Sequence, residues 1–260
     1  MIAHRARKRF GQNFLIEPRV IADIVTAIAP ARGDRLVEIG PGQGALTAPL
    51  LDRLDSLDVV EIDRDLVAGL AARFPGERLR IHTGDALDFD FAPLGPQLRV
   101  VGNLPYNIST PLLFHLASFA PVLRDLHFML QQEVVERMVA TPGGGEFGRL
   151  SVMLQYRFDM ESLFIVPPEA FSPAPKVYSA VVRMRPRPQA ALTAKDEGAL
   201  AQVVAAAFGQ RRKMLRNTLR GLFTAEELVA LGISATQRAE ELAVEDFVRL
   251  ANYLVSRQLV

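Results

Sequence analysis

The chain has 260 residues, and none of them is cysteine. This absence excludes disulfides, thiolate zinc sites, iron–sulfur clusters and cysteine nucleophiles. Histidine is scarce as well: His4, His82, His115 and His127 are far apart and show no spacing typical of metal ligands. We therefore expect a protein without a metal centre.

Long apolar runs are also missing. No stretch approaches the ~20 apolar residues that a membrane helix requires, and no apolar segment follows the basic N-terminus as in a secretory signal. The hydrophobic content of 49% is ample for a core, and the length fits one large domain or a large and a small one. We expect a cytoplasmic protein with no membrane partner. We also expect a monomer, because no apolar helix face is left unaccounted for.

An unusual tetrad, Asn103-Leu104-Pro105-Tyr106, follows an apolar stretch that begins at Leu98. Pro105 has no N–H and holds Leu104 extended, so backbone carbonyls stay free at the end of the predicted strand. The Asn103 side chain adds another acceptor, and Tyr106 adds an aromatic face. This combination suits a planar group that carries an exocyclic amine, such as adenine. The alternative is an ordinary turn in which Asn103 caps a helix and Tyr106 packs.

A glycine-rich loop follows the first predicted strand of a doubly wound α/β sheet, residues 35–39. Glycines let the backbone approach a ligand, and the next helix offers free N–H groups at its start. The pattern Gly40-x-Gly42-x-x-Ala45 fits a dinucleotide site, whereas Glu38-x-Gly40-x-Gly42-x-Gly44 fits a methyltransferase. The loop alone therefore leaves a nicotinamide-dependent oxidoreductase open.

Two carboxylates follow the next predicted strands. Glu61 lies near the carboxyl end of the strand over residues 57–63, about 20 residues beyond the loop, where a ribose-binding acid is expected. Asp85 follows the strand over residues 79–82 and can accept from an adenine amine. Because parallel strands end at one sheet edge, we expect the loop, both acids and the tetrad to share one site.

The remaining pattern indicates a mostly parallel sheet with an antiparallel strand, followed by a small all-helical region. We divide the chain into domains 1–186 and 187–260 at the linker Arg185–Gln189. Further strands are predicted over residues 98–101, 125–130, 151–158 and 177–184. Helices are predicted over residues 18–28, 109–119, 133–139, 199–208, 211–220 and 245–255, with a capping-box start at Thr224.

Local basic clusters matter because the formal net charge is only +1. In the predicted helix 211–220, arginines recur at i, i+4 and i+8 beside an apolar face made by Leu215, Leu219 and Phe223. No acid interrupts this stripe, which favours an anionic partner over a solvated face. The residues predicted to bind phosphates are Arg7, Lys8, Arg9, Arg211, Arg212, Lys213, Arg216 and Arg220.

Taken together, the motifs resemble those of the ribosomal RNA adenine N6,N6-dimethyltransferase family, in particular its bacterial small-subunit branch. They are Phe10–Leu15, Glu38–Gly44, Asn103–Tyr106, Asn107–Pro111, Phe171-x-Pro173-x-Pro175-Lys176-Val177 and Gln210–Lys213. The resemblance implies a Rossmann-like class I methyltransferase fold and S-adenosylmethionine as methyl donor, with no metal. It also implies that the substrate is a pair of adjacent adenines near the 3′ end of 16S ribosomal RNA in an assembling 30S particle.

The resemblance further implies roles for individual residues. Those expected to bind the cofactor are Asn13, Leu15, Gly40, Glu61, Asp85 and Asn103. Those expected to act on the adenine are Asn103, Leu104, Pro105, Tyr106 and Phe171, the last as a second stacking ring. A proline-stiffened connector with Phe171 in the core is the alternative for that residue. For the whole chain, an RNA-binding assembly factor without catalysis is a second alternative.

Overall fold

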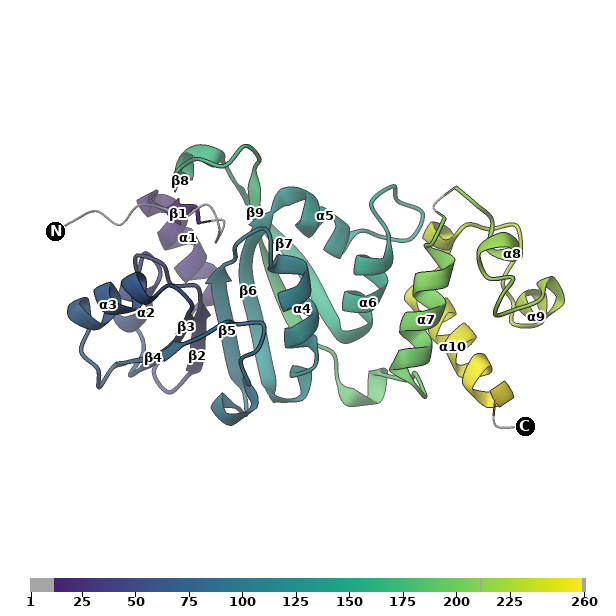
Figure 1. Cartoon of the computed structure of the whole chain (residues 1–260), viewed down its shortest axis with the longest axis horizontal. Helices are drawn as coiled ribbons and strands as arrows, with labels where there is room; N and C mark the ends of the chain where they lie inside the picture. Colours follow the sequence, from purple (N-terminus) through teal and green to yellow (C-terminus); the bar gives the residue numbers. More distant parts are fainter. Residues whose placement is uncertain (1–11, 211, 259–260) are drawn as a thin grey trace. The chain divides into compact units, whose positions relative to one another are not determined.

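The computed structural model describes residues 12–210 and 212–258, and it divides into two compact units (Figure 1). The first unit contains the chain up to Val135 together with Asp159–Pro186, and the second contains Glu136–Phe158 and the chain from Arg187 onward. The chain thus enters the second unit twice, whereas the sequence pattern suggested one crossing after residue 186. None of the described helices is long and apolar enough to cross a membrane.

A seven-stranded sheet forms the centre of the first unit, in the order β4-β3-β2-β5-β6-β9-β7. Neighbouring strands from β4 to β6 run parallel, and β9 pairs antiparallel with β6. This arrangement confirms the predicted mostly parallel sheet with an antiparallel strand. The strands are β2 Arg35–Ile39, β3 Leu57–Glu61, β4 Leu79–Thr83, β5 Leu98–Asn103, β6 Leu123–Gln131, β7 Phe158–Val166 and β9 Ser179–Pro186.

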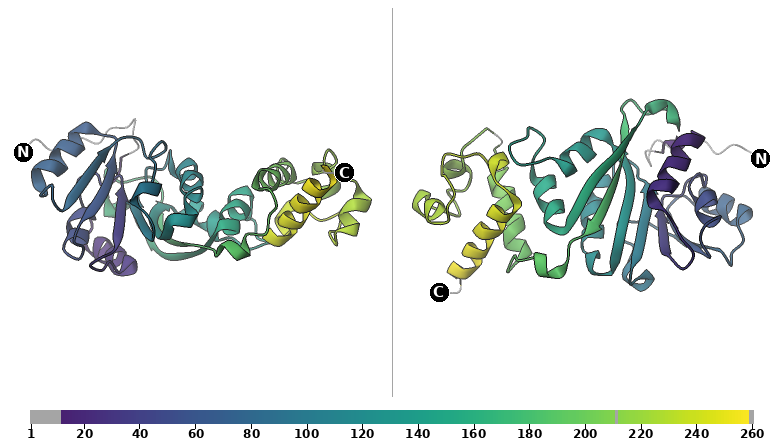
Figure 2. Two further views of the ribbon diagram at one scale, coloured as in Figure 1. Left: turned by 90° about the horizontal axis from the view of Figure 1, so that it is seen from below. Right: turned by 180° about the vertical axis from the view of Figure 1, so that it is seen from behind.

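Helices cover both faces of this sheet (Figure 2). Alternate strand residues such as Leu36, Val59 and Val101 share a core cluster with α1 and α2. Their neighbours Val37 and Val60 point to the other face and are also buried, as expected for a parallel sheet. The helices are α1 Pro18–Ile28, α2 Thr47–Leu51, α3 Arg64–Arg73, α4 Ser109–Ala117 and α5 Gln132–Val139.

A small antiparallel pair ties the start of the described chain to the proline-rich segment. Strand β1, Phe14–Leu15, pairs with β8, Phe171–Ser172 (Figure 1). In this pair Leu15 lies opposite Phe171. The backbone N–H of Ile16 also donates to the Ala170 carbonyl at 2.8 Å. This pair was not predicted, because strands of two residues carry no periodic signal.

The second unit is helical around its own apolar core. Its helices are α6 Arg149–Arg157, α7 Glu197–Ala207, α8 Leu215–Thr218, α9 Ala225–Ala230 and α10 Val244–Gln258. Short 3-10 turns lie at Gln189–Ala191 and Ala239–Glu241 in this unit, and at Ala92–Leu94, Ala120–Val122 and Pro168–Ala170 in the first unit. The capping box at Thr224 is confirmed: the hydroxyl accepts from the Glu227 N–H at 3.2 Å, and the Glu227 carboxylate accepts from the Thr224 N–H at 2.8 Å.

The predicted strand over residues 151–158 is wrong, because this segment is the helix α6. Alternating apolar residues, Leu150, Val152, Leu154 and Tyr156, imitate a strand pattern. In the structure Val152 and Tyr156, four residues apart, join the core of the C-terminal helices. Packing against that core therefore selected the helical period.

The predicted helix over residues 211–220 is also wrong in its length, because α8 covers only Leu215–Thr218. Met214 is extended and forms an antiparallel bridge with Arg238, which prevents the helix from starting earlier. Arg212 and Arg220 therefore lie outside the helix. The predicted apolar face is confirmed, since Leu215, Leu219 and Phe223 are buried in the core.

Candidate active site

A cavity of about 310 Å³ opens in the first unit at the carboxyl ends of β2, β3 and β5. All six predicted cofactor-binding residues line it: Asn13, Leu15, Gly40, Glu61, Asp85 and Asn103. Leu104, Pro105 and Tyr106 of the tetrad line it as well. Sheet topology thus brings together side chains that are up to 93 residues apart in sequence, from Asn13 to Tyr106.

The glycine loop forms one wall of this cavity, and its backbone requires glycine. Gly40 and Gly42 have φ values of 65° and 57°, in the left-handed region that other residues rarely adopt. A Cβ on Gly42 would also lie 3.1 Å from the Phe14 ring. The Gly40 N–H donates to the Val60 carbonyl at 2.9 Å, which holds the loop against β3.

Glu61 and Asp85 stand where the strand order predicts. The Glu61 carboxylate is 5% exposed and accepts from the N–H groups of Asp63, at 2.9 Å, and Gly42, at 3.3 Å. Burial raises the pKa of Glu61. One oxygen of Asp85 accepts from the Leu87 N–H at 2.9 Å. Each carboxylate has further lone pairs, so both can still accept hydrogen bonds from a ligand in the cavity.

Glu38 also lines the cavity, although we had not predicted a role for it. It is 2% exposed, and its carboxylate accepts from the Thr47 hydroxyl at 2.6 Å. Burial is the main reason that the pKa of Glu38 rises to about 7, and the nearby Glu61 carboxylate raises it further. Its place two residues before Gly40 in the loop pattern was the available sequence signal.

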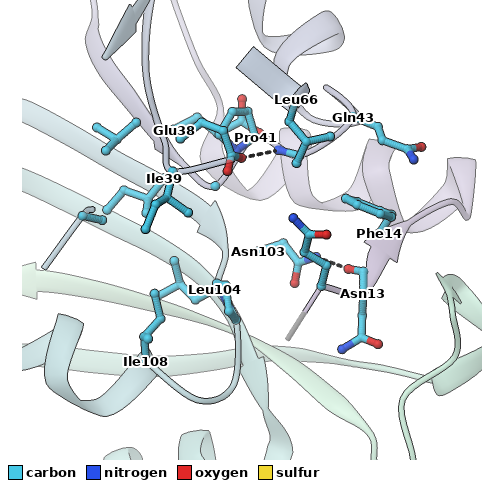
Figure 3. Close-up of a pocket in the computed structure, with 18 of the residues that line it drawn as sticks. Asn13, Phe14, Glu38, Ile39, Pro41, Gln43, Leu66, Asn103, Leu104 and Ile108 are labelled. Carbon is cyan, nitrogen blue, oxygen red and sulfur yellow. Dashed lines mark hydrogen bonds between the residues drawn. The ribbon is translucent and has the colours of Figure 1, made fainter. Parts of the chain in front are cut away.

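The side-chain amide of Asn103 has a defined orientation. Its Nδ2 donates to the backbone carbonyl of Asn13 at 2.9 Å, shown as a dashed line in Figure 3. A carbonyl can only accept, so the nitrogen of the amide must face Asn13 and the oxygen must occupy the other branch. Since Asn103 lines the cavity, Oδ1 remains the acceptor that this side chain can offer to a bound group.

The backbone hydrogen bonds of the tetrad indicate which carbonyl can serve, beside Asn103 Oδ1, as a second acceptor for a bound group. The Pro105 carbonyl accepts from the Ile108 N–H at 3.2 Å, and the Tyr106 carbonyl accepts from the Ser109 hydroxyl at 3.2 Å. Within the described ranges, no hydrogen bond engages the carbonyl of Leu104. Of the two predicted carbonyls, Leu104 and Pro105, the geometry therefore favours Leu104.

Comparisons with known proteins decide the family. The family model described as "Ribosomal RNA adenine dimethylase" matches residues 3–256. This chain belongs to the ribosomal RNA adenine dimethylase family. It is 63% identical over 257 residues to "Ribosomal RNA small subunit methyltransferase A" of Aromatoleum aromaticum, with 99% of this chain and 97% of the relative covered. A protein of the same name from Dechloromonas aromatica is 59% identical, with 98% and 100% covered.

Solved structures agree on the fold of this ribosomal RNA adenine dimethylase. A dimethyladenosine transferase from Plasmodium falciparum matches with a TM-score of 0.84 at 24% identity, covering 94% of this chain and 98% of that one. The 23S rRNA methyltransferase ErmE matches with a TM-score of 0.70 at 26% identity, covering 94% and 100%. The predicted class I methyltransferase fold is therefore confirmed.

Phe171 is the one predicted catalytic residue that the structure does not bring into the cavity. Its side chain is 3% exposed and belongs to the core cluster that includes Leu15, Ile24 and Val166. This position agrees with the alternative interpretation, in which Phe171 packs in the core. Tyr106 is the aromatic side chain of the tetrad that lines the cavity.

The predicted phosphate-binding residues that the structure describes do not line this cavity. Arg212, Lys213, Arg216 and Arg220 are exposed on the second unit of the dimethylase. Arg7, Lys8, Arg9 and Arg211 lie outside the described residues. Within the part of the chain that the structure describes, no group of three or more metal-binding side chains is found.

Proposed function

We propose that this dimethylase transfers methyl groups from S-adenosylmethionine to the N6 amines of two adjacent adenines near the 3′ end of small-subunit ribosomal RNA. The observation that carries the proposal is the Asn103 amide, which lines the cavity and is oriented by the Asn13 carbonyl. An oxygen held in this way suits an exocyclic amine that must donate a hydrogen bond while it reacts.

The residues around the cavity fit S-adenosylmethionine. Glu61 would accept from the ribose hydroxyls, Asp85 would accept from the adenine amine, and Asn13 and Leu15 would close over the methionine end. Gly40 and Gly42 adopt the left-handed backbone of this loop, and a Cβ on Gly42 would crowd Phe14, which also lines the cavity. When bound, this cofactor supplies an electrophilic methyl group, and the chemistry requires no metal.

The protein's task is to make a poor nucleophile react. The lone pair of an adenine amine is delocalised into the ring, so transfer requires the amine to pyramidalise and gain positive charge. Acceptors at Asn103 Oδ1 and the Leu104 carbonyl would strengthen their hydrogen bonds as that charge grows, which stabilises the transition state. Tyr106 would stack on the base at about 1–3 kcal/mol. The surplus proton would leave to water, because neither asparagine nor a carbonyl is a base.

Basic side chains would hold the substrate RNA together with the cavity that contains the tetrad. Exposed Arg212, Lys213, Arg216 and Arg220 would contact phosphates, and so would the basic N-terminal arm and Arg211. Such contacts add salt-sensitive affinity but little sequence selectivity. We propose that the RNA is met in an assembling small subunit and that the enzyme acts as a monomer.

One experiment tests the function directly. The protein is incubated with labelled S-adenosylmethionine and small subunits that lack this modification, and the RNA nucleosides are then separated by mass. We expect N6,N6-dimethyladenosine, and its absence would refute the proposal. In parallel, thermal unfolding is followed with S-adenosylmethionine or NAD added, because stabilisation by NAD alone would favour the oxidoreductase alternative.

A further inference from the structure

Tyr106 is held by a hydrogen bond from a distant part of the chain. Its phenolic oxygen lies 2.8 Å from the hydroxyl oxygen of Ser179, at the first position of β9. The Ser179 side chain is fully buried. Burial of the Tyr106 phenol raises its pKa, so the phenol keeps its proton and can donate or accept in this pair.

Strand topology explains how residues 73 positions apart meet. The carboxyl end of β5 leads into the tetrad, and Asn103 pairs with Met129 on β6. On the other side of β6, Gln131 pairs with Ser179. Because β9 runs antiparallel, its first residue lies at the edge where the parallel strands end. Two strand spacings amount to about 10 Å, a gap that the long tyrosine side chain spans in part.

We propose that Ser179 is a positioning residue for methyl transfer: its hydroxyl sets the plane of the Tyr106 ring, on which the target adenine stacks. This inference rests on the function proposed above and adds a residue from outside the tetrad. Tyr106 is then held at two points, at its carbonyl by Ser109 and at its phenol by Ser179. With its backbone held by Ser109 and its phenol held by Ser179, Tyr106 presents the stacked base at one angle, so that the amine of the base reaches Asn103 Oδ1 and the Leu104 carbonyl together.

Loss of the Ser179 hydroxyl should make the Tyr106 ring more mobile without weakening the binding of the cofactor. A net hydrogen bond is worth enough to change a rate by roughly three- to tenfold. We therefore expect Ser179→Ala to lower kcat for methylation of small subunits by that factor. The KM for subunits should change less, and the Kd for S-adenosylmethionine should stay the same. A role in stability alone would move the unfolding midpoint but leave kcat of the folded protein unchanged.

A double-mutant cycle with Tyr106→Phe tests the pairing. If Ser179 acts through the phenol, then Ser179→Ala, Tyr106→Phe and the double variant should lose similar amounts of kcat. Additive losses, or an unchanged kcat for Ser179→Ala, would overturn the inference. Should Ser179→Ala fail to fold, Tyr106→Phe alone decides, because full activity without the phenol would also overturn it.

Ser151→Ala is the matched control. Ser151 is equally buried, lies in the second unit, and its hydroxyl donates to the Arg137 carbonyl. We expect its loss to affect stability but not kcat of the folded protein. The unsubstituted enzyme separates the two hypotheses: if it forms no dimethyladenosine the proposed function fails, whereas an active parent with an equally active Ser179→Ala refutes only the role of Ser179.

Discussion

Gly102 is the position where a single methyl group should disturb the catalytic tetrad most directly. A Cβ at this glycine would lie 2.5 Å from the backbone carbonyl oxygen of Ile39 and 3.1 Å from a methyl of Leu104. Ordinary contact begins at 3.4 Å, so the ends of β5 and β2 would have to separate by about 0.9 Å. The atom in the way belongs to the backbone, so no side-chain rotation can relieve the clash.

We expect Gly102→Ala to destabilise the protein by about 1–3 kcal/mol, the usual cost of overpacking. The activity should fall further than stability explains. Asn103 follows Gly102 directly, and a misplacement of about 1 Å at reacting groups can cost on the order of 100-fold in rate. Urea unfolding followed by circular dichroism gives the stability, and single-turnover methylation of small subunits gives the rate.

Gly69→Ala serves as the control for this prediction. Gly69 lies within α3, where a Cβ would meet nothing within 4 Å. Alanine favours the helix over glycine, so this substitution should stabilise the protein by about 0.5–1 kcal/mol and leave the rate unchanged. If Gly102→Ala proves as stable and as fast as the parent enzyme, the close approach of β5 to Ile39 is not a constraint and the reasoning fails.

Three further predictions concern the cavity and the basic surface. Asn103→Ala should abolish methyl transfer while S-adenosylmethionine still binds, as measured by calorimetry. Appreciable turnover would show that the Asn103 amide is not the required acceptor for the target amine. Burial raises the pKa of Glu38 from 4.5 to about 7 in the folded protein. The free energy of unfolding should therefore fall by up to about 3 kcal/mol as pH rises from about 4.5 to about 7, because the carboxyl group ionises more readily in the unfolded chain. Glu38→Gln should remove that slope in urea titrations at several pH values, and an unchanged slope would contradict the burial argument. Replacing Arg212, Arg216 and Arg220 together by glutamine should reduce the slope of log Kd against log salt concentration for subunit binding by about two to three. An unchanged slope would indicate that these arginines only form a solvated surface.

Local motifs predicted more of the site than of the second unit. The glycine loop, Glu61, Asp85 and the tetrad each follow a strand, and the ends of parallel strands meet at one edge whatever the details of packing. All of these residues line the same cavity. In contrast, residues 149–157 alternate like a strand and became a helix only because Val152 and Tyr156 pack with the C-terminal helices.

Local sequence patterns did not predict that Asn13 and Leu15 line the cavity. Only the family resemblance placed them there, because the pairing of β1 with β8 joins segments more than 150 residues apart. The same pairing includes the buried Phe171, for which the family resemblance had implied the role of a stacking ring. Which aromatic side chain faces a cavity depends on tertiary packing, and spacing in the sequence does not encode it.

By itself, the sequence determined the doubly wound sheet, the edge that carries the site, and the residue types that suit an adenine and its methyl donor. These follow from short-range rules: strand periodicity, proline and glycine geometry, and the chemistry of each side chain. Only the tertiary structure decided that Asn103 is oriented by Asn13, that Ser179 holds Tyr106, and that Phe171 is core. Such contacts depend on register and strand order over tens of residues, where the free energy of packing the whole unit outweighs any local preference.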